Sequence, residues 1–368
     1  MPSIADHLPR AWAEVDLAAV VSNARTVSRI AGARLLPMVK ANAYGLGAVP
    51  VARALEAMDP WGFGVATPEE GTELRRAGIA RPIVVFSPLA PATVEACLRD
   101  DLRPVIGDLD GLAAWRAAGD RPFHVEVDTG MARAGFRWDE VPAWRDAVTA
   151  AGPACEGIFT HFHSADENPA SVAGQWTRFR DVLALLACRP SLVHAANSAA
   201  MLRLPEARFD LVRPGIAVFG VAPRADLVPE LKPAMRVRTE IVALRTVAVG
   251  ERIGYGHTWQ AQRESVVATI PMGYADGLDR QLSNRGSALV RGKRVPIAGT
   301  VSMDLTMLDV TDVPGVRVSD EAVVLGAQEG PLGRDAITAL EVAQLTGRIP
   351  WEVLTSVSRR VPRFYREP

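Results

Sequence analysis

Short apolar runs alternate with amphipathic segments over roughly the first 220 residues of the chain. Eight runs have the length and composition of buried strands, at 35–39, 61–66, 82–86, 103–106, 123–127, 155–162, 192–194 and 211–219. Segments with helical periodicity lie between most of them, at 48–58, 68–77, 90–98, 109–118, 138–150, 172–187 and 198–204. Thr67 followed by Pro68, Glu69 and Glu70 is a typical helix start, with a cap, a first-turn proline and two acids.

This alternation predicts an α/β fold. Eight strands separated by helices indicate a parallel (β/α)8 barrel, and a doubly wound open sheet is the alternative. The number of strands and the absence of a GxGxxG motif favour the barrel. Active sites of such barrels lie at the carboxyl ends of the strands. The polar residues that end these runs would therefore share one rim: Lys40, Asp128, His161, His194 and Arg213.

The pattern changes near residue 235. Strand-like segments at 235–249, 265–271, 288–298, 301–310 and 321–326 are separated by turn signals, and one helix is expected at 337–345. We expect two domains: a barrel over 1–233 and a mostly antiparallel β-domain over 234–368. The first strand, at about 11–17, could join either domain. The segment 223–233 is rich in proline and charge, which is typical of a linker.

Composition excludes several classes of function. The 368 residues are 48% hydrophobic with a formal net charge of −1, so the chain has no electrostatic footprint for nucleic acid or an anionic membrane. Cys97, Cys155 and Cys188 form no CxxC motif, which indicates reduced thiols. No signal peptide is expected, and no apolar run approaches the roughly 20 residues that span a bilayer. These features predict a cytoplasmic protein.

Lysine and tyrosine are rare, and their positions are informative. The chain has 41 Lys+Arg, but its only lysines are Lys40, Lys232 and Lys293. Lys40 ends an apolar strand, where desolvation would lower its pKa and where an imine could form, neither of which arginine permits. Of four tyrosines, Tyr44 follows Lys40 closely, and Tyr255 and Tyr274 lie in glycine-flanked loops that can approach a ligand.

Two cofactor hypotheses follow. Arg213-Pro214-Gly215-Ile216 and Ala196-Asn197-Ser198 lie in the last two barrel loops, where phosphate groups often bind, although Ser198 could equally cap a helix. A lysine with a phosphate cradle on a barrel indicates pyridoxal 5'-phosphate (PLP). Alternatively, His161, His163 and Asp166 could bind zinc in a barrel hydrolase, although no second ligand pair is evident.

The motifs resemble those of alanine racemases. The resemblance is carried by Val39-Lys40-Ala41-Asn42-Ala43-Tyr44-Gly45, Asp128-Thr129-Gly130-Met131-Ala132-Arg133, Thr160-His161-Phe162, His194-Ala195-Ala196-Asn197-Ser198, Arg213-Pro214-Gly215-Ile216, Gly254-Tyr255-Gly256, Gly273-Tyr274-Ala275-Asp276-Gly277 and Ser302-Met303-Asp304. Their order matches, and they extend over nearly the whole chain. The resemblance implies the fold-type III architecture, a PLP-binding barrel plus a β-domain, in a head-to-tail homodimer with shared active sites.

The resemblance also implies roles for individual residues. Lys40 would hold PLP through an imine, and Arg213 would face its pyridine nitrogen. The phosphate of PLP would be bound by Tyr44, Ser198, Gly215 and Ile216. Tyr255 and Met303 would come from the other subunit, and Tyr274 and Asp304 would support the substrate route. Racemisation moves protons on both faces of a carbon, which requires two acid/bases. These would be Lys40 and Tyr255, the latter assisted by His161, itself bonded to Arg213. The implied reaction converts L-alanine to D-alanine.

The chain departs from the family at two positions. Glu126 stands where a lysine, often carbamylated, usually orients the arginine matched here by Arg133, a contact of the substrate carboxylate. Strand alternation places Glu126 inward, where its carboxylate could take the same role. Arg359 replaces a tyrosine that would bond Tyr44. Other activities remain open: a racemase for serine or a broader set of small amino acids, a PLP-dependent decarboxylase, a non-enzymatic PLP-binding module and the zinc hydrolase.

Overall fold

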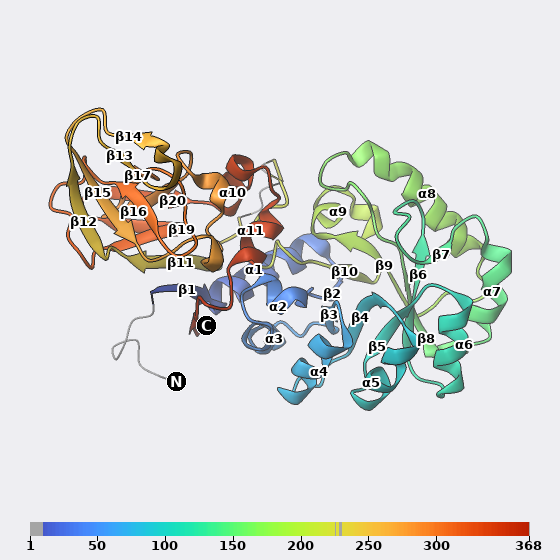
Figure 1. Ribbon diagram of the computed structural model, residues 1–368. Helices are drawn as coiled ribbons and strands as arrows, with labels where there is room; N and C mark the ends of the chain where they lie inside the picture. Colours follow the sequence, from blue (N-terminus) through green and yellow to red (C-terminus); the bar gives the residue numbers. More distant parts are fainter. Residues whose placement is uncertain (1–9, 225, 228–229, 368) are drawn as a thin grey trace. The chain divides into compact units, whose positions relative to one another are not determined.

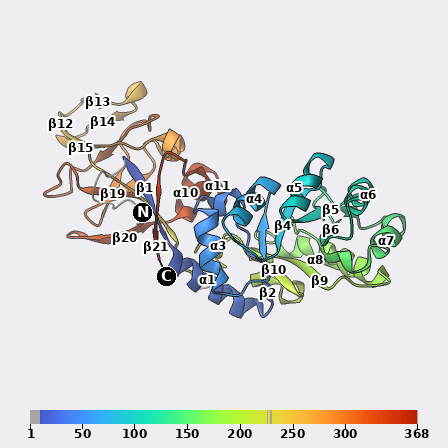
Figure 2. The same ribbon diagram turned by 90° about the horizontal axis from the view of Figure 1, so that it is seen from below.

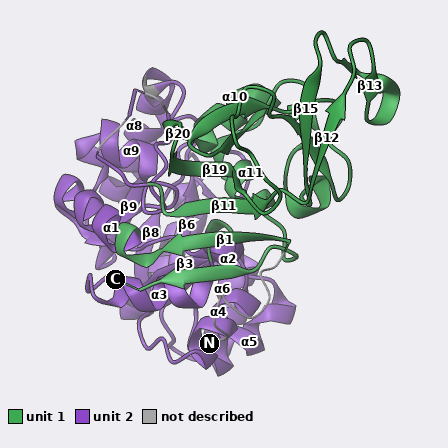
Figure 3. Cartoon of the chain, turned by 90° about the vertical axis from the view of Figure 1, so that its left-hand side faces the viewer, with its two compact units in different colours: residues 1–19, 44–46, 233–368 green, residues 20–43, 47–232 purple. Residues whose placement is uncertain are grey.

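The computed structural model describes residues 10–224, 226, 227 and 230–367, so part of the expected linker lies outside the described residues. The chain divides into two compact units (Figure 3). The first comprises residues 1–19, 44–46 and 233–368, and the second residues 20–43 and 47–232. Among the described residues, no helix combines the length and the apolar character needed to cross a membrane.

The second unit is a closed barrel of eight parallel strands, surrounded by helices (Figures 1 and 2). The strands pair in the order β2-β10-β9-β8-β6-β5-β4-β3, and a parallel bridge between Met38 and Gly64 closes the ring. Their bounds are β2 Arg34–Leu35, β3 Phe63–Val65, β4 Ile83–Pro88, β5 Arg103–Ile106, β6 Phe123–Asp128, β8 Cys155–Phe159, β9 Leu192–Asn197 and β10 Leu211–Arg213; the short β7 (Phe136–Arg137) pairs with β6. The barrel prediction is confirmed.

The barrel helices begin where the sequence provides start signals. Thr67 caps α4, accepting a hydrogen bond from the Glu70 amide, and Asp108 caps α6 in the same way. The helices are α1 Leu17–Ala31, α3 Ala48–Glu56, α4 Pro68–Arg76, α5 Val94–Arg99, α6 Leu109–Ala117, α7 Val141–Thr149, α8 Pro169–Leu185 and α9 Ser198–Arg203. The sequence patterns missed α1, although Asp16 marks its start by accepting a hydrogen bond from the Ala19 amide at 2.8 Å.

Prolines shorten two barrel strands relative to their apolar runs. β10 stops at Arg213 because Pro214 has no amide hydrogen, and residues 215–220 then form turns rather than the predicted strand. β2 stops at Leu35, two residues before Pro37. Inside the unit, one apolar cluster joins positions in or beside six barrel strands: Leu36, Val84, Val105, Phe159, Leu192 and Leu211. This packing fixes the strands whose carboxyl ends carry the polar residues.

The first unit is a β-domain that includes the N-terminal strand β1 (Ala11–Asp16). Its main sheet has the order β17-β16-β19-β11-β1-β21, in which only the β1–β21 pairing is parallel. The other elements are β11 Met235–Glu240, β12 Ala243–Val247, β13 Arg252–Ile253, β14 Trp259–Gln260, β15 Ser265–Ile270, β16 Ser287–Val290, β17 Lys293–Pro296, β18 Thr306–Asp309, β19 Glu321–Gly330, β20 Gly333–Ile337, β21 Arg363–Arg366, α10 Ala339–Thr346 and α11 Pro350–Ser356. The mostly antiparallel character matches the prediction.

Candidate active site

Lys40 lies just beyond β2, at the start of the five-residue segment α2 (Lys40–Tyr44). Both oxygens of the Glu70 carboxylate are engaged beside it, since the amides of Ala41 and Ala66 each donate to it at 2.7 Å. Burial lowers the pKa of Lys40, as do the charges of Arg133 and Arg213, whereas Glu70 opposes this shift. Lys40 can therefore lose its proton more readily than an ordinary lysine.

The backbone after Lys40 is left-handed. Ala41, Asn42 and Ala43 have φ values of 51°, 54° and 51°, a conformation that costs roughly 1–2 kcal/mol for each L-residue. Local hydrogen bonds hold this turn. The Asn42 side-chain oxygen accepts from the Ala48 amide at 2.8 Å, and the Asn42 backbone carbonyl accepts from the Gly47 amide at 2.8 Å. Strain fixed in this way concentrates at functional sites.

Arg213 ends β10 and is 3% exposed. Its guanidinium donates to His194 Nδ1 at 2.8 Å and His161 Nδ1 at 3.3 Å, and to the carbonyls of Thr160 and Ala195 at 3.0 and 3.1 Å. Burial lowers the pKa of Arg213 to about 10, which still leaves it charged at neutral pH. The site therefore contains a fixed buried cation that can only donate hydrogen bonds.

His161 lies two residues beyond β8. Burial, with the nearby charges of Arg213, Arg133 and Lys40, lowers the pKa of His161 to about 3, so the ring is neutral. Because Arg213 can only donate, Nδ1 of His161 accepts, and the ring proton is assigned to Nε2. His161 consequently offers one N–H donor from Nε2.

The loops after β9 and β10 lie side by side. Asn197, rather than Ser198, caps α9, accepting hydrogen bonds from the amides of Ala199 and Ala200. The Ser198 hydroxyl accepts a hydrogen bond from the Gly215 amide at 3.0 Å, and Ile216 is fully buried. This arrangement leaves the Ser198 hydroxyl hydrogen free of any capping role.

Glu126 lies on β6 and is 5% exposed. Burial raises the pKa of Glu126 to about 7, although the charges of Arg133 and Arg213 pull it down. Arg133 lies on the exposed loop after β6, whose turn is held by the Asp128 carboxylate accepting from the amides of Gly130 and Ala132 at 2.9 and 3.0 Å. Within this part of the structure, no direct hydrogen bond joins Glu126 to Arg133.

The described residues contain no group of three His, Cys, Asp or Glu side chains that could hold a metal ion. His163, one of the possible zinc ligands, instead bonds the Ser164 hydroxyl through Nδ1 at 2.7 Å. One unit therefore contains the lysine, the arginine and the paired loops after β9 and β10, whereas its described residues form no zinc site.

The remaining candidates lie in the β-domain unit. Tyr255 and Tyr274 begin short 3-10 turns after glycines, and Tyr255, Tyr274 and Met303 are 73%, 43% and 51% exposed. Tyr44 groups with this unit, where the Gly45 carbonyl beside it accepts from Arg363 Nε at 3.0 Å. Burial raises the pKa of Tyr44. Exposed aromatic side chains on ordered loops are available to a second molecule.

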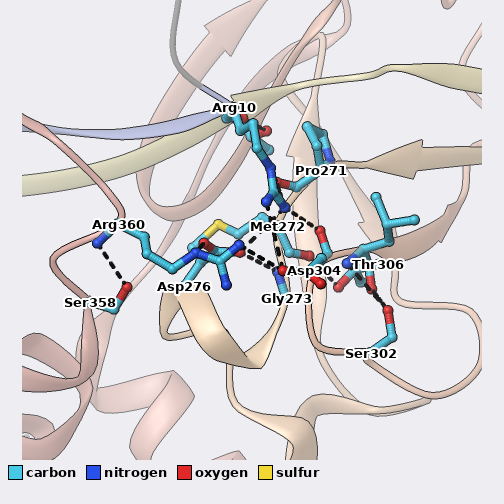
Figure 4. Close-up of polar contacts among 12 residues, drawn as sticks. Arg10, Pro271, Met272, Gly273, Asp276, Ser302, Asp304, Thr306, Ser358 and Arg360 are labelled. Carbon is cyan, nitrogen blue, oxygen red and sulfur yellow. Dashed lines mark hydrogen bonds and ion pairs between the residues drawn. The ribbon is translucent and has the colours of Figure 1, made fainter.

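Two arginines tie together the loops that carry Tyr274 and Met303 (Figure 4). Arg360 pairs with Asp276 at 3.4 Å and with Asp304 at 2.6 Å. Arg10 donates to the Pro271 carbonyl at 2.9 Å and the Asp304 carbonyl at 2.6 Å. Asp276 is buried and also accepts from the Gly273 amide at 3.0 Å, so its carboxylate anchors the turn.

Family models match both parts of the chain. Residues 15–223 match the alanine racemase N-terminal domain, and residues 234–365 match the alanine racemase C-terminal domain. The chain belongs to the alanine racemase family.

Similar alanine racemases cover nearly the full length. The alanine racemase of Sorangium cellulosum (strain So ce56) is 54% identical, with 97% of this chain and 99% of that protein aligned. The alanine racemase of Carboxydothermus hydrogenoformans is 41% identical over 96% of this chain and 99% of that protein. The crystal structure of alanine racemase from D-cycloserine producing Streptomyces lavendulae has a TM-score of 0.90, with 37% identity over 99% of this chain and 98% of that chain.

The sequence patterns assigned no contacts to Glu70 and His194. Glu70 was assigned only as a first-turn helix acid, yet it also holds the backbone at Ala41. His194 was recognised only as a strand-end residue and part of a motif. In the structure its Nδ1 accepts a hydrogen bond from Arg213 Nη1 at 2.8 Å, the shortest side-chain contact of that guanidinium. The expectation that His194 ends its strand is wrong: it is the third residue of β9, and the parallel pairing of β9 with β10 brings its ring to Arg213.

Proposed function

We propose that this chain racemises alanine with PLP bound at Lys40, converting L-alanine to D-alanine. One observation carries the proposal: the scarce Lys40 sits at the barrel rim with a lowered pKa, within reach of the charge of the buried Arg213. Such a pair suits a lysine that must exchange protons near neutral pH. Family membership fits the same reaction.

The chemistry of the side chains fits PLP. A deprotonatable lysine can form an imine with the aldehyde, and Ser198 with the amides of Gly215 and Ile216 would hold the phosphate, together with Tyr44. Arg213 presents donors only, which suits an unprotonated pyridine nitrogen. When bound, PLP supplies an electron sink for the α-carbon of the amino acid.

Two residues would move the proton. Lys40 would take it from, or return it to, one face of the α-carbon, and Tyr255 of the partner subunit would act on the other. The 73% exposure of Tyr255 in its own unit supports this role across subunits. The Nε2–H of His161 can donate to the phenolate and so assist Tyr255, because His161 stays neutral.

The substrate carboxylate would bind Arg133, which the Glu126 charge would orient without a direct hydrogen bond, and Met303 of the partner subunit would limit side-chain size. Asp304 and Tyr274 would support the substrate route. An arginine at the pyridine nitrogen weakens the electron sink, which disfavours side reactions such as decarboxylation. We place this homodimer in the cytoplasm, in D-alanine biosynthesis, and its three free cysteines agree with a reducing compartment.

An absorption spectrum and a racemisation assay test the proposal. The purified protein should absorb violet light through the imine, and borohydride should bleach that band and abolish activity. Pure L-alanine and pure D-alanine should each reach the same racemic mixture. A PLP-loaded protein that releases carbon dioxide from the amino acid, or interconverts serine but not alanine, would overturn the assignment.

A further inference from the structure

A chain of buried polar side chains continues from Arg213 into the barrel. Arg213 Nη1 lies 2.8 Å from His194 Nδ1, and His194 Nε2 lies 2.9 Å from His124 Nδ1. His124 Nε2 then faces Glu156 Oε2 at 3.5 Å. Both histidines are fully buried, and the Phe159 ring stacks on His194 at a centroid distance of 4.8 Å. These contacts leave each ring one fixed orientation.

This series of polar contacts runs from one end of the barrel to the other. Arg213 is the last residue of β10, whereas Glu156 is the second residue of β8. Arg103, whose Nε lies 3.6 Å from the Glu156 carboxylate, is the first residue of β5. First residues of parallel barrel strands lie at the face opposite the active-site rim. The contacts therefore begin at the reaction rim and end at a carboxylate on the other face.

The donor properties of arginine fix the directions of the Arg213–His194 and His194–His124 hydrogen bonds. Arg213 can only donate, so His194 Nδ1 accepts, and the single proton of the neutral ring sits on Nε2. That proton is donated to His124 Nδ1, which leaves the His124 proton on Nε2, facing the Glu156 carboxylate. A second proton, on Nδ1 of either histidine, would point that N–H at the N–H group of the preceding residue and break the hydrogen bond between them. Burial lowers the pKa of both His194 and His124, in agreement with neutral rings.

We propose that His124 and Glu156 are positioning residues of the racemase, acting through His194 to hold the Arg213 guanidinium against His161 and the pyridine nitrogen. This inference rests on the proposed function. The Glu156 carboxylate selects the Nε2–H form of His124, which keeps Nδ1 of His124 open as the acceptor for His194. Reversal of either ring would turn a donor toward Arg213 and displace it.

Imidazole ¹⁵N NMR of the loaded enzyme tests the chain without measuring activity. The protein has six histidines, so histidine-labelled enzyme gives a small set of signals that single variants can assign. His194 and His124 should both show the neutral Nε2–H tautomer, unchanged between about pH 6 and pH 9, where an ordinary histidine loses its charge. A protonated His194, or one with its proton on Nδ1, would overturn the proposal.

Matched variants test the positioning role. His124→Leu removes the acceptor and should lower kcat about ten-fold with little change in KM, while the His194 signals shift. His124→Gln retains an accepting oxygen and should keep most of kcat, which excludes a purely steric effect. Glu156→Gln should lower kcat less and change the His124 signals. Glu321→Gln, at a similarly half-buried acid paired with Arg236 and Arg238, is the control and should change neither.

The outcomes distinguish failure of the positioning role from failure of the proposed racemase function. If the tautomers are as expected but His124→Leu and Glu156→Gln both retain the parental kcat, the positioning role is overturned. Should His124→Leu fail to fold by circular dichroism, the comparison of Glu156→Gln with Glu321→Gln decides. A parent enzyme with no racemase activity would overturn the proposed function, whereas the hydrogen-bond chain would still be judged by its tautomer signals.

Discussion

At the scale of single residues, Lys40 is the most direct test of the chemistry. Lys40→Arg keeps the positive charge but removes a group that can lose its proton and form an imine. We expect the fold to persist, the violet absorbance to disappear and kcat to fall by at least about 10²-fold. Lys293→Arg is the control, because Lys293 lies in the other unit and donates to the Asp312 carbonyl there. Turnover by Lys40→Arg at the parental rate would contradict the mechanism.

Glu126 tests whether a glutamate can orient Arg133. Glu126→Gln keeps the shape but loses the charge that fixes the guanidinium, which the parent carries above its pKa of about 7. KM for alanine should rise several-fold, the absorbance of bound PLP should stay the same, and bicarbonate should not affect the parent enzyme. Glu140→Gln, at an exposed acid beyond the same loop, should leave KM unchanged. A parental KM and kcat in Glu126→Gln would rule this role out.

The same carboxyl has a pH signature. Burial raises its pKa to about 7 from an ordinary value of 4.5, so the folded state binds this proton more tightly than the unfolded state. Its contribution to stability is thus fully present below the ordinary value and is lost as the pH rises through about 7. Melting curves of the cofactor-free protein should show Glu126→Gln gaining stability relative to the parent over that interval. A constant difference in melting temperature would indicate an ordinary, exposed carboxyl.

At the scale of elements, the Arg360 bridge should position the Tyr274 and Met303 loops. Arg360→Gln removes the ion pairs with Asp276 and Asp304, and we expect a several-fold increase in KM with a smaller effect on kcat. Arg360 and Asp304 are exposed, and the buried Asp276 keeps its hydrogen bond from the Gly273 amide, so the melting temperature should move only slightly. Arg263→Gln, which breaks an exposed pair with Asp312, is the control. Equal kinetic effects in the two variants would argue against a local role.

Some elements could be predicted from the sequence and others could not. Strand β5 and the start of α4 follow directly from local signals, namely an apolar run and a capped, proline-initiated turn. The left-handed backbone at 41–43 has no such signal, because alanine disfavours this conformation and only Glu70 and the neighbouring loop make it persist. The contacts of His194 and His124 likewise depend on strand register across the barrel, which no local pattern specifies.

At the scale of the whole molecule, the proposed site needs Lys40 from one subunit and Tyr255 from its partner. Lys40→Ala and Tyr255→Phe should each be inactive as pure proteins. After subunit exchange, half of an equimolar mixture is heterodimer, and each heterodimer has one intact and one doubly altered site. Activity should therefore return to about one quarter of the parental value and should peak at equal amounts of the two variants. Exchange must be shown independently, for example with subunits of different mass. Full exchange without recovered activity would mean that both residues of a site come from one chain, and the exposure of Tyr255 would then need another explanation.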